Sequence, residues 1–271
     1  MRPTASFTPA LPLLVAALLT PTCLLTAQNR GPQHRDYVEK SSPDFHVQMG
    51  FSGGEWEHET SGSGLDDDAE ALLFRFKFEG NNSRGIGGGF RFEYLASDDD
   101  LFEDAGFNPT EARVFSGFLH FTYRVDARRF TMPVRVGLMS NYYTLEEVAT
   151  GGTPPSDDQV KYLSFGPYLE FAPEVVLAGR RQVQWSLYGE FGGGFGFTGI
   201  EIDGDSNDYY STTLLAGVEA GMKLRFGPVE IGAAYVGRWQ WMDESEPEGG
   251  SVVFGYDADY HGFLFTMGAR F

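Results

Sequence analysis

The chain has 271 residues and a formal net charge of −18. An acidic excess of this size argues against nucleic acid as a partner, because its phosphates would be repelled. Aromatic residues make up 15% of the chain and 24 residues are Phe, which is too much apolar ring surface for a disordered acidic chain. Beyond the N-terminal segment no run of about 18 apolar residues occurs, so no transmembrane helix is expected in the mature chain.

Residues 1–27 have the pattern of a secretory signal peptide. Arg2 supplies positive charge, residues 11–19 form a short apolar core, and Ala27 offers a small residue for cleavage. The one cysteine, Cys23, lies in this segment, so cleavage after Ala27 would leave a mature chain with no thiol. A lipid anchor attached to Cys23 is the competing interpretation. Residues 28–43 are polar and lack periodicity, which indicates a flexible periplasmic lead-in.

From Asp44 onward, apolar and polar residues alternate in ten stretches, the period-2 pattern of β-strands. In the second stretch, charged residues alternate with Phe74, Phe76 and Phe78. One face needs lipid or a core, and the other needs water or ion pairs. The expected strands fall in residues 44–53, 72–79, 86–94, 115–125, 134–142, 163–171, 183–197, 213–225, 229–241 and 263–271.

The connections alternate between long acidic loops and short basic turns. The expected long loops are residues 60–69, 97–111, 145–159, 203–208 and 243–255. Two features interrupt this regularity. Pro167 removes a ladder hydrogen bond and predicts a bulge or a break in its strand. The connection 173–182 is longer than the other short turns, and residues 174–178 are compatible with one helical turn.

The closing stretch places Phe263, Phe265, Met267 and Phe271 on one face and ends the chain on an aromatic residue. This ending resembles the last strand of bacterial outer-membrane β-barrels. The resemblance implies a monomeric, antiparallel up-and-down barrel of about ten strands (8–12) over residues 44–271, located in the outer membrane. It also implies contact with lipid and lipopolysaccharide, and recognition of the closing strand by the barrel-assembly machinery.

The inward faces of such a barrel carry both signs of charge, and buried charges must be paired. One interpretation is an ion-pair plug. The other is a narrow polar path, in which the inward glycines of residues 86–94 and 183–197 leave space beside the charges. The predicted interior network consists of Arg75, Lys77, Glu79, Arg91, Glu93, Arg135, Glu170, Glu190, Glu219, Lys223, Arg225, Glu230 and Arg238.

Catalytic and metal-binding patterns are sparse. Asp259 and His261 have the Asp-x-His spacing that resembles the omptin surface proteases, but both share the face of Phe263, the expected lipid side. The run 203–207 resembles the start of a calcium loop and then departs from it at Asp208. No metal site, cofactor or catalytic residue is therefore predicted. Divalent cations that bridge the acidic loops to lipopolysaccharide phosphates are a weaker hypothesis.

The sequence thus predicts a non-enzymatic outer-membrane barrel with a structural or surface-interaction role. A narrow porin-like channel is the first alternative, and an omptin-like surface protease is the second. A soluble β-sandwich or a soluble ligand-binding barrel is the rival fold, in which the Phe faces would point inward and the charged faces outward.

Overall fold

The computed structural model describes residues 44–61, 65–98, 101–102, 110–147, 159–180, 183–203, 207, 209–245 and 252–271. The predicted signal peptide (1–27) and lead-in (28–43) lie outside the described residues. Within the described ranges, no helix is long and apolar enough to cross a membrane.

The described residues form eleven antiparallel β-strands. These are β1 (Asp44–Thr60), β2 (Leu65–Asn81), β3 (Ile86–Ser97), β4 (Thr110–Ala127), β5 (Phe130–Glu147), β6 (Gln159–Phe171), β7 (Glu174–Arg180), β8 (Val183–Ile202), β9 (Tyr209–Phe226), β10 (Val229–Met242) and β11 (Tyr256–Arg270).

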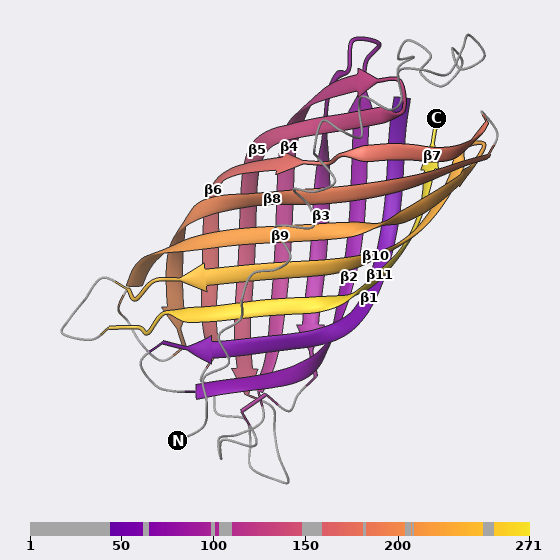
Figure 1. The fold of residues 1–271 in the computed structure, drawn as a ribbon. Helices are drawn as coiled ribbons and strands as arrows, with labels where there is room; N and C mark the ends of the chain where they lie inside the picture. Colours follow the sequence, from indigo (N-terminus) through magenta and orange to yellow (C-terminus); the bar gives the residue numbers. More distant parts are fainter. Residues whose placement is uncertain are drawn as a thin grey trace, which may run out of the picture. The chain divides into compact units, whose positions relative to one another are not determined.

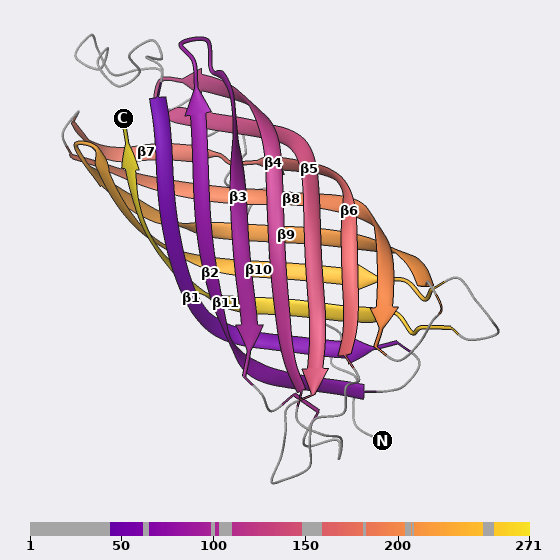
Figure 2. The ribbon, with the colours of Figure 1, turned by 180° about the vertical axis from the view of Figure 1, so that it is seen from behind.

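The strands close into one barrel with ten strand positions (Figures 1 and 2). Closure occurs between the first and last strands, whose register runs from His46 opposite Arg270 to Thr60 opposite Tyr256. Next to the His46–Arg270 pair, the backbone N–H groups of Phe45 and Phe271 each donate to the carbonyl of the other, at 3.0 and 2.9 Å. The predicted all-β antiparallel barrel of about ten strands is confirmed.

Strands β6 and β7 together make one position in the wall, because both pair with β5 and with β8. The helical turn expected at residues 174–178 is wrong. Their backbone groups pair with β8, which satisfies them better than an isolated turn would. Pro167 does not break β6, since the register with β8 is the same on both sides, with Phe165 opposite Phe197 and Tyr168 opposite Gly194.

Several strands extend further than their apolar pattern suggested. The stretch 60–69, predicted as an acidic loop, is mostly strand, and Asp66 and Asp68 lie directly opposite Glu59 and Glu57. The apolar alternation stops where the outer face becomes acidic, although the backbone pairing continues. We call the end of the barrel that carries the connections β1–β2, β3–β4, β5–β6, β8–β9 and β10–β11 the loop end, and the other the turn end.

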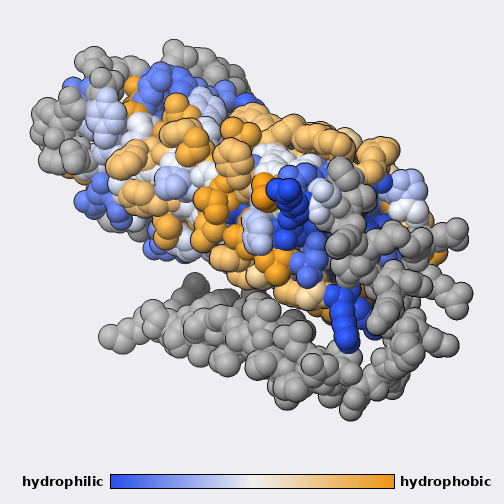
Figure 3. Space-filling view, turned by 90° about the horizontal axis from the view of Figure 1, so that it is seen from above, coloured by the Kyte–Doolittle hydropathy of each residue, from blue (hydrophilic) through white to orange (hydrophobic). Residues whose placement is uncertain are grey.

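Apolar side chains cover the outside of the barrel and charged side chains fill its middle. Phe121 and Phe265 are 80% and 66% exposed, whereas Arg75 is 1% exposed. Figure 3 shows apolar side chains gathered over the middle of the barrel, with hydrophilic ones toward its ends. This polarity excludes the rival β-sandwich and is the one that a surrounding hydrocarbon layer requires.

Candidate functional site

An ion-pair layer crosses the middle of the lumen. It consists of Arg75, Lys77, Glu79, Arg91, Glu93, Arg135, Glu170, Glu190, Glu219 and Arg238. Its basic and acidic members are equal in number. Arg75 on β2 pairs with Glu219 on β9, on the opposite side of the barrel, and also donates to Gln48 Oε1 at 3.0 Å. The layer therefore ties distant strands together across the lumen.

The remaining pairs of this layer are less completely buried than Arg75 and Glu219. Arg238 holds both carboxylate oxygens of Glu93, at 2.6 and 2.9 Å, which is the bidentate geometry of the strongest charge-assisted hydrogen bonds. Arg135 donates to Glu79 at 2.7 Å and also pairs with Glu170. Each charge has an opposite partner, as burial in a lumen requires.

Glu190 is the most connected carboxylate of the layer. It pairs with Lys77, and its oxygens lie 3.4, 3.7 and 4.0 Å from guanidinium nitrogens of Arg135, Arg91 and Arg75. Its side chain is 13% exposed, whereas the other four carboxylates of the layer are 1–7% exposed. Glu190 is therefore both the meeting point of four cations and the least enclosed acid.

The last three predicted interior residues form a separate group nearer the turn end. Glu230 lies 3.6 Å from Lys223 Nζ and 3.4 Å from Arg225 Nη2. The sequence prediction missed Glu174, whose carboxylate lies 2.7 Å from the same Lys223, and His46, which lies 3.5 Å from Glu230. Glu174 was missed because its strand was not foreseen.

An aromatic layer fills the lumen at the loop end, and this layer was not predicted. It consists of Trp56, His58, Phe102, Tyr143, Tyr162, Tyr209, Tyr256 and Tyr260, all buried. The rings pack edge to face or stacked, with centroids 5.0–5.9 Å apart, and such pairs add to the stabilisation from burial. The sequence does contain a signal for this layer. Trp56 and His58 are separated from the inward residue Ser52 by even numbers of positions, so they lie on the same inward face.

The chain between β3 and β4 contributes to this layer. Leu101 and Phe102 are buried against it, and the backbone N–H of Phe102 donates to a carboxylate oxygen of Asp67 on β2. Within the layer, the Tyr143 hydroxyl lies 2.7 Å from His58 Nδ1. The loop end of the described lumen is thus packed with rings.

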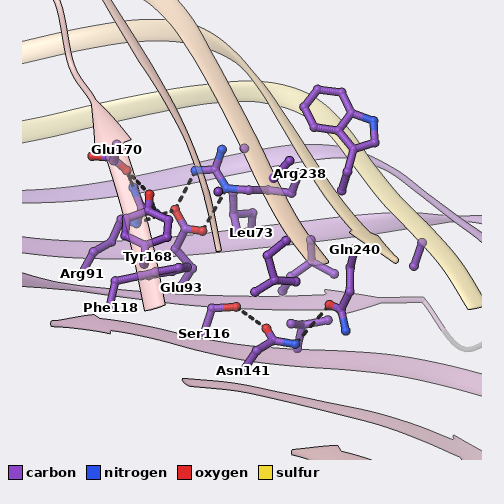
Figure 4. Close-up of a pocket in the computed structure, with 18 of the residues that line it drawn as sticks. Leu73, Arg91, Glu93, Ser116, Phe118, Asn141, Tyr168, Glu170, Arg238 and Gln240 are labelled. Carbon is purple, nitrogen blue, oxygen red and sulfur yellow. Dashed lines mark hydrogen bonds and ion pairs between the residues drawn. The ribbon is translucent and has the colours of Figure 1, made fainter. Parts of the chain in front are cut away.

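A cavity of about 60 Å³ lies between the two layers (Figure 4). Arg91, Glu170 and Glu190 line it from the ion-pair layer and Trp56 from the aromatic layer. A buried water occupies roughly 10–15 Å³ of such volume, so this middle cavity has room for about four to six waters and not for a sugar or an amino acid.

A second cavity of about the same volume lies at the turn end. Its lining is strongly polar and includes Asp44, His46, Lys77, Glu190 and Glu230. Among the described residues, Glu190 is the one that lines both cavities.

The inward glycines do not leave an open path beside the charges, contrary to the second interpretation of the interior. A Cβ atom at Gly194 would collide with the sulfur of Met139 and lie 2.7 Å from the Pro167 carbonyl oxygen. A Cβ at Gly89 would lie 3.1 Å from His120 Nε2. These glycines make room for neighbouring side chains, which occupy the space themselves.

An acidic rim lies on the outer face, next to the apolar surface. Along β1 the outward residues change from Phe51 to glutamate, and the carboxylates continue on both neighbouring strands. Glu57 lies directly opposite Asp68 and Asp259, so like charges face each other across the sheet. Burial and the charge of Asp259 raise the pKa of Glu57. The rim consists of Glu55, Glu57, Glu59, Asp66, Asp68, Glu70, Asp257 and Asp259.

Asp259 and His261 lie together on this outer face. Asp259 Oδ2 is 3.2 Å from His261 Nε2, and the Tyr235 hydroxyl is 2.7 Å from His261 Nδ1. The next outward residue, Phe263, is 68% exposed. The pair therefore borders the apolar surface, outside the lumen. Among the described residues, no group of three or more His, Cys, Asp or Glu side chains is placed to hold a metal ion.

The predicted closing-strand residues all face outward. Phe263, Phe265, Met267 and Phe271 are 63–74% exposed. They form one continuous apolar row beside the outward residues of β1 and β10.

No protein-family model matches the chain, and no curated protein matches it. Solved structures do resemble it. The outer-membrane protease OmpT from Escherichia coli is 12% identical, with 86% of this chain and 97% of that chain covered and a TM-score of 0.45. Neisserial surface protein A is 11% identical, with 82% and 95% covered and a TM-score of 0.30. The attachment invasion locus protein Ail of Yersinia pestis is 14% identical, with 83% and 99% covered and a TM-score of 0.27.

At 11–14% identity and TM-scores below 0.5, these likenesses concern the fold and carry nothing about activity. The closed ring of antiparallel strands with its apolar outer face gives the chain the fold of an outer-membrane β-barrel, as its closing strand predicted.

Proposed function

We propose that the chain is an integral outer-membrane barrel that does not conduct solutes and that has a structural or surface-interaction role. The loop end faces outward in this proposal, and the turn end faces the periplasm, the usual arrangement for single-chain barrels with long and short connections. The acidic rim then lies at the level of the outer headgroups.

The two stacked layers in the lumen are the observation that carries this proposal. A ten-strand barrel is close in size to the eight-strand barrels whose interiors side chains fill. Here paired charges occupy the middle and packed rings occupy the loop end. The cavities of about 60 Å³ that the described residues line are too small for common nutrients.

Conductance of the refolded protein in a planar bilayer tests this proposal against the porin-like alternative. We expect no unit conductance steps from the wild-type chain. A variant that thins both layers, with Arg75→Ser, Glu219→Ser, Tyr143→Ala and Tyr256→Ala, serves as the positive control for detection. Stable steps from wild-type protein whose folding is verified by heat-modifiable gel mobility would favour the channel instead.

The acidic rim supports a role for divalent cations. Directly opposed carboxylates on neighbouring strands destabilise a sheet by about 0.2–1 kcal/mol per pair. Cations between the rim and lipopolysaccharide phosphates would relieve this repulsion and attach the barrel to its lipid. Among the described residues, no cluster of three or more His, Cys, Asp or Glu side chains is placed to bind one metal ion. We therefore propose that cations bridge the rim loosely and do not occupy a coordination site.

Thermal unfolding with magnesium or sodium at equal ionic strength, in micelles containing lipopolysaccharide, tests the rim. We expect magnesium to raise the unfolding temperature of the wild type more than that of a Glu57→Gln, Asp68→Asn, Asp259→Asn variant. The control, Glu201→Gln with Asp203→Asn, removes two acids elsewhere at the loop end that pair with Lys161 and, among the described residues, do not face other carboxylates across the sheet. Equal magnesium effects on all three proteins would count against cation bridging.

The proposed role is non-enzymatic. The Asp259–His261 pair that resembles the omptin motif borders the apolar surface, whereas a general base must reach a bound substrate. We expect Asp259→Ala and His261→Ala to leave any peptidase activity of the preparation unchanged. Loss of such an activity in both variants would favour the omptin-like alternative.

We further propose that the barrel-assembly machinery recognises the closing strand. Its outward row ends at the exposed Phe271, beside Phe45 of the first strand. Phe271→Ala should lower the amount of folded barrel in the outer membrane while leaving refolding into detergent unaffected. Tyr123→Ala, which removes an exposed ring from a central strand, is the control.

A further inference from the structure

Two cavities lie among the described residues of the lumen, and Glu190 lines both of them. Glu190 lines the middle cavity together with Arg91 and Glu170, and it lines the turn-end cavity together with Lys77 and Arg135. No other described residue is common to the two linings. The carboxylate of Glu190 therefore stands where the two spaces come nearest to each other.

The position of this carboxylate depends on charge more than on packing. Four cations surround it, with Lys77 paired directly and three guanidinium groups within 3.4–4.0 Å. A Cβ at its neighbour Gly189 would lie 3.4 Å from the Glu219 carbonyl oxygen, an ordinary van der Waals contact, so the chain beside Glu190 is not tightly packed. One carboxylate oxygen, Oε2, has no hydrogen-bond partner although it is buried. Ion pairs therefore hold Glu190 in the position where it lines both cavities.

We propose that Glu190 is an ion-paired partition that controls access from the turn end to the middle of the barrel. The inference rests on the proposed closed lumen and deepens it by naming the element that closes its periplasmic half. The aromatic layer closes the other half. Because each cavity has room for only a few waters, the molecules that Glu190 keeps out of the middle cavity are water and solutes of a few non-hydrogen atoms.

Thiol accessibility tests this partition in the full chain. The sequence has one cysteine, which is replaced by Cys23→Ser, and a reporter thiol is placed in the middle cavity by Ser116→Cys. Thr131→Cys reports on the turn-end cavity. Methyl methanethiosulfonate, a small neutral reagent, converts an accessible thiolate to a methyl disulfide and releases methanesulfinate, and mass spectrometry measures the rate.

We expect the reporter at 131 to react in every background. The reporter at 116 should be protected when Glu190 is present and react about tenfold faster or more with Glu190→Ala. A charge-balanced variant, Lys77→Met with Glu190→Ala, should show the same increase. The matched control is Glu219→Ala, which removes an equally large carboxylate of the same layer that lines neither cavity.

Three results would overturn the proposal. These are rapid reaction at 116 with Glu190 intact, continued protection with Glu190→Ala in folded protein, and an equal increase with Glu219→Ala. Wild-type conductance, which decides whether the lumen is closed as a whole, is measured without any reporter thiol. The failure of the partition and the failure of the closed-lumen proposal are therefore separable.

Discussion

His58 should make the stability of the barrel fall as the pH is lowered. Its ring is 1% exposed, stacks on Tyr256 at 5.4 Å and lies 2.7 Å from the Tyr143 hydroxyl. Its outward neighbours Glu57 and Glu59 are exposed acids, so this part of β1 lies beyond the apolar surface. Burial lowers the pKa of His58 from 6.5 to about 4.

The sign follows from which state binds the proton. Between pH 6.5 and pH 4 the unfolded chain protonates this histidine, whereas the folded barrel excludes the proton, so the free energy of unfolding decreases. A difference of this size between the two pKa values corresponds to a loss of about 2 kcal/mol at pH 5 and about 3 kcal/mol at pH 4, relative to pH 7.5. Little further loss from this residue is expected below pH 4.

Urea unfolding in micelles, followed by tryptophan fluorescence at pH 7.5, 6, 5 and 4, measures this effect. Acidic residues titrate in the same range, so the informative quantity is the wild-type curve minus that of His58→Gln, which keeps a polar group near Tyr143. The control is His261→Gln. The hydrogen bond that His261 donates to the Asp259 carboxylate raises the pKa of His261, so replacing His261 should change the pH dependence in the opposite sense. Parallel curves for wild type and His58→Gln would refute the reasoning, because the imidazole would then be hydrated in the folded state.

Three further predictions concern the wall and the ion-pair layer. Glu219→Leu alone should lower the free energy of unfolding by about 3–5 kcal/mol because Arg75 loses its partner, whereas the double variant with Arg75→Met should be near neutral in the same urea assay. A double variant as unstable as the single one would contradict this account. Gly194→Ala should lower the free energy of unfolding by about 1–3 kcal/mol through overpacking, and Gly199→Ala, with no atom within 4 Å of its Cβ position, should lower it little. Equally small losses would show that the Met139 side chain can move away from the added methyl group at no cost. Phe265→Lys, on the exposed outer face, should cost about 2–4 kcal/mol in bilayers, and a negligible cost would place this residue outside the hydrocarbon.

The fold was predictable because the signal for a barrel strand is local. Alternate residues of a strand face opposite sides, so the series Phe74, Arg75, Phe76, Lys77 already separates a lipid face from a lumen face. The strand ends were less predictable. Where the outer face turns acidic, at Glu55, the apolar side chain moves to the inward face at Trp56. The pattern therefore changes phase, although the hydrogen-bonded ladder continues to Thr60.

The predicted interior charges do lie in the lumen, but their partners could not be predicted. Arg75 and Glu219 are 144 residues apart in the chain and meet because ring closure brings β2 and β9 face to face. The height of each side chain in the lumen depends on the stagger between neighbouring strands, which local sequence does not encode. For the same reason, the middle and turn-end cavities and the place of Glu190 between them were not foreseen.

The alternation of residue types is enough to predict a barrel with its apolar side outward, because this pattern repeats every two residues along each strand. The filling of the lumen depends on contacts between distant strands. The aromatic layer, the split wall position of β6 and β7, and the pairing of every buried charge all depend on side chains that meet across a closed ring.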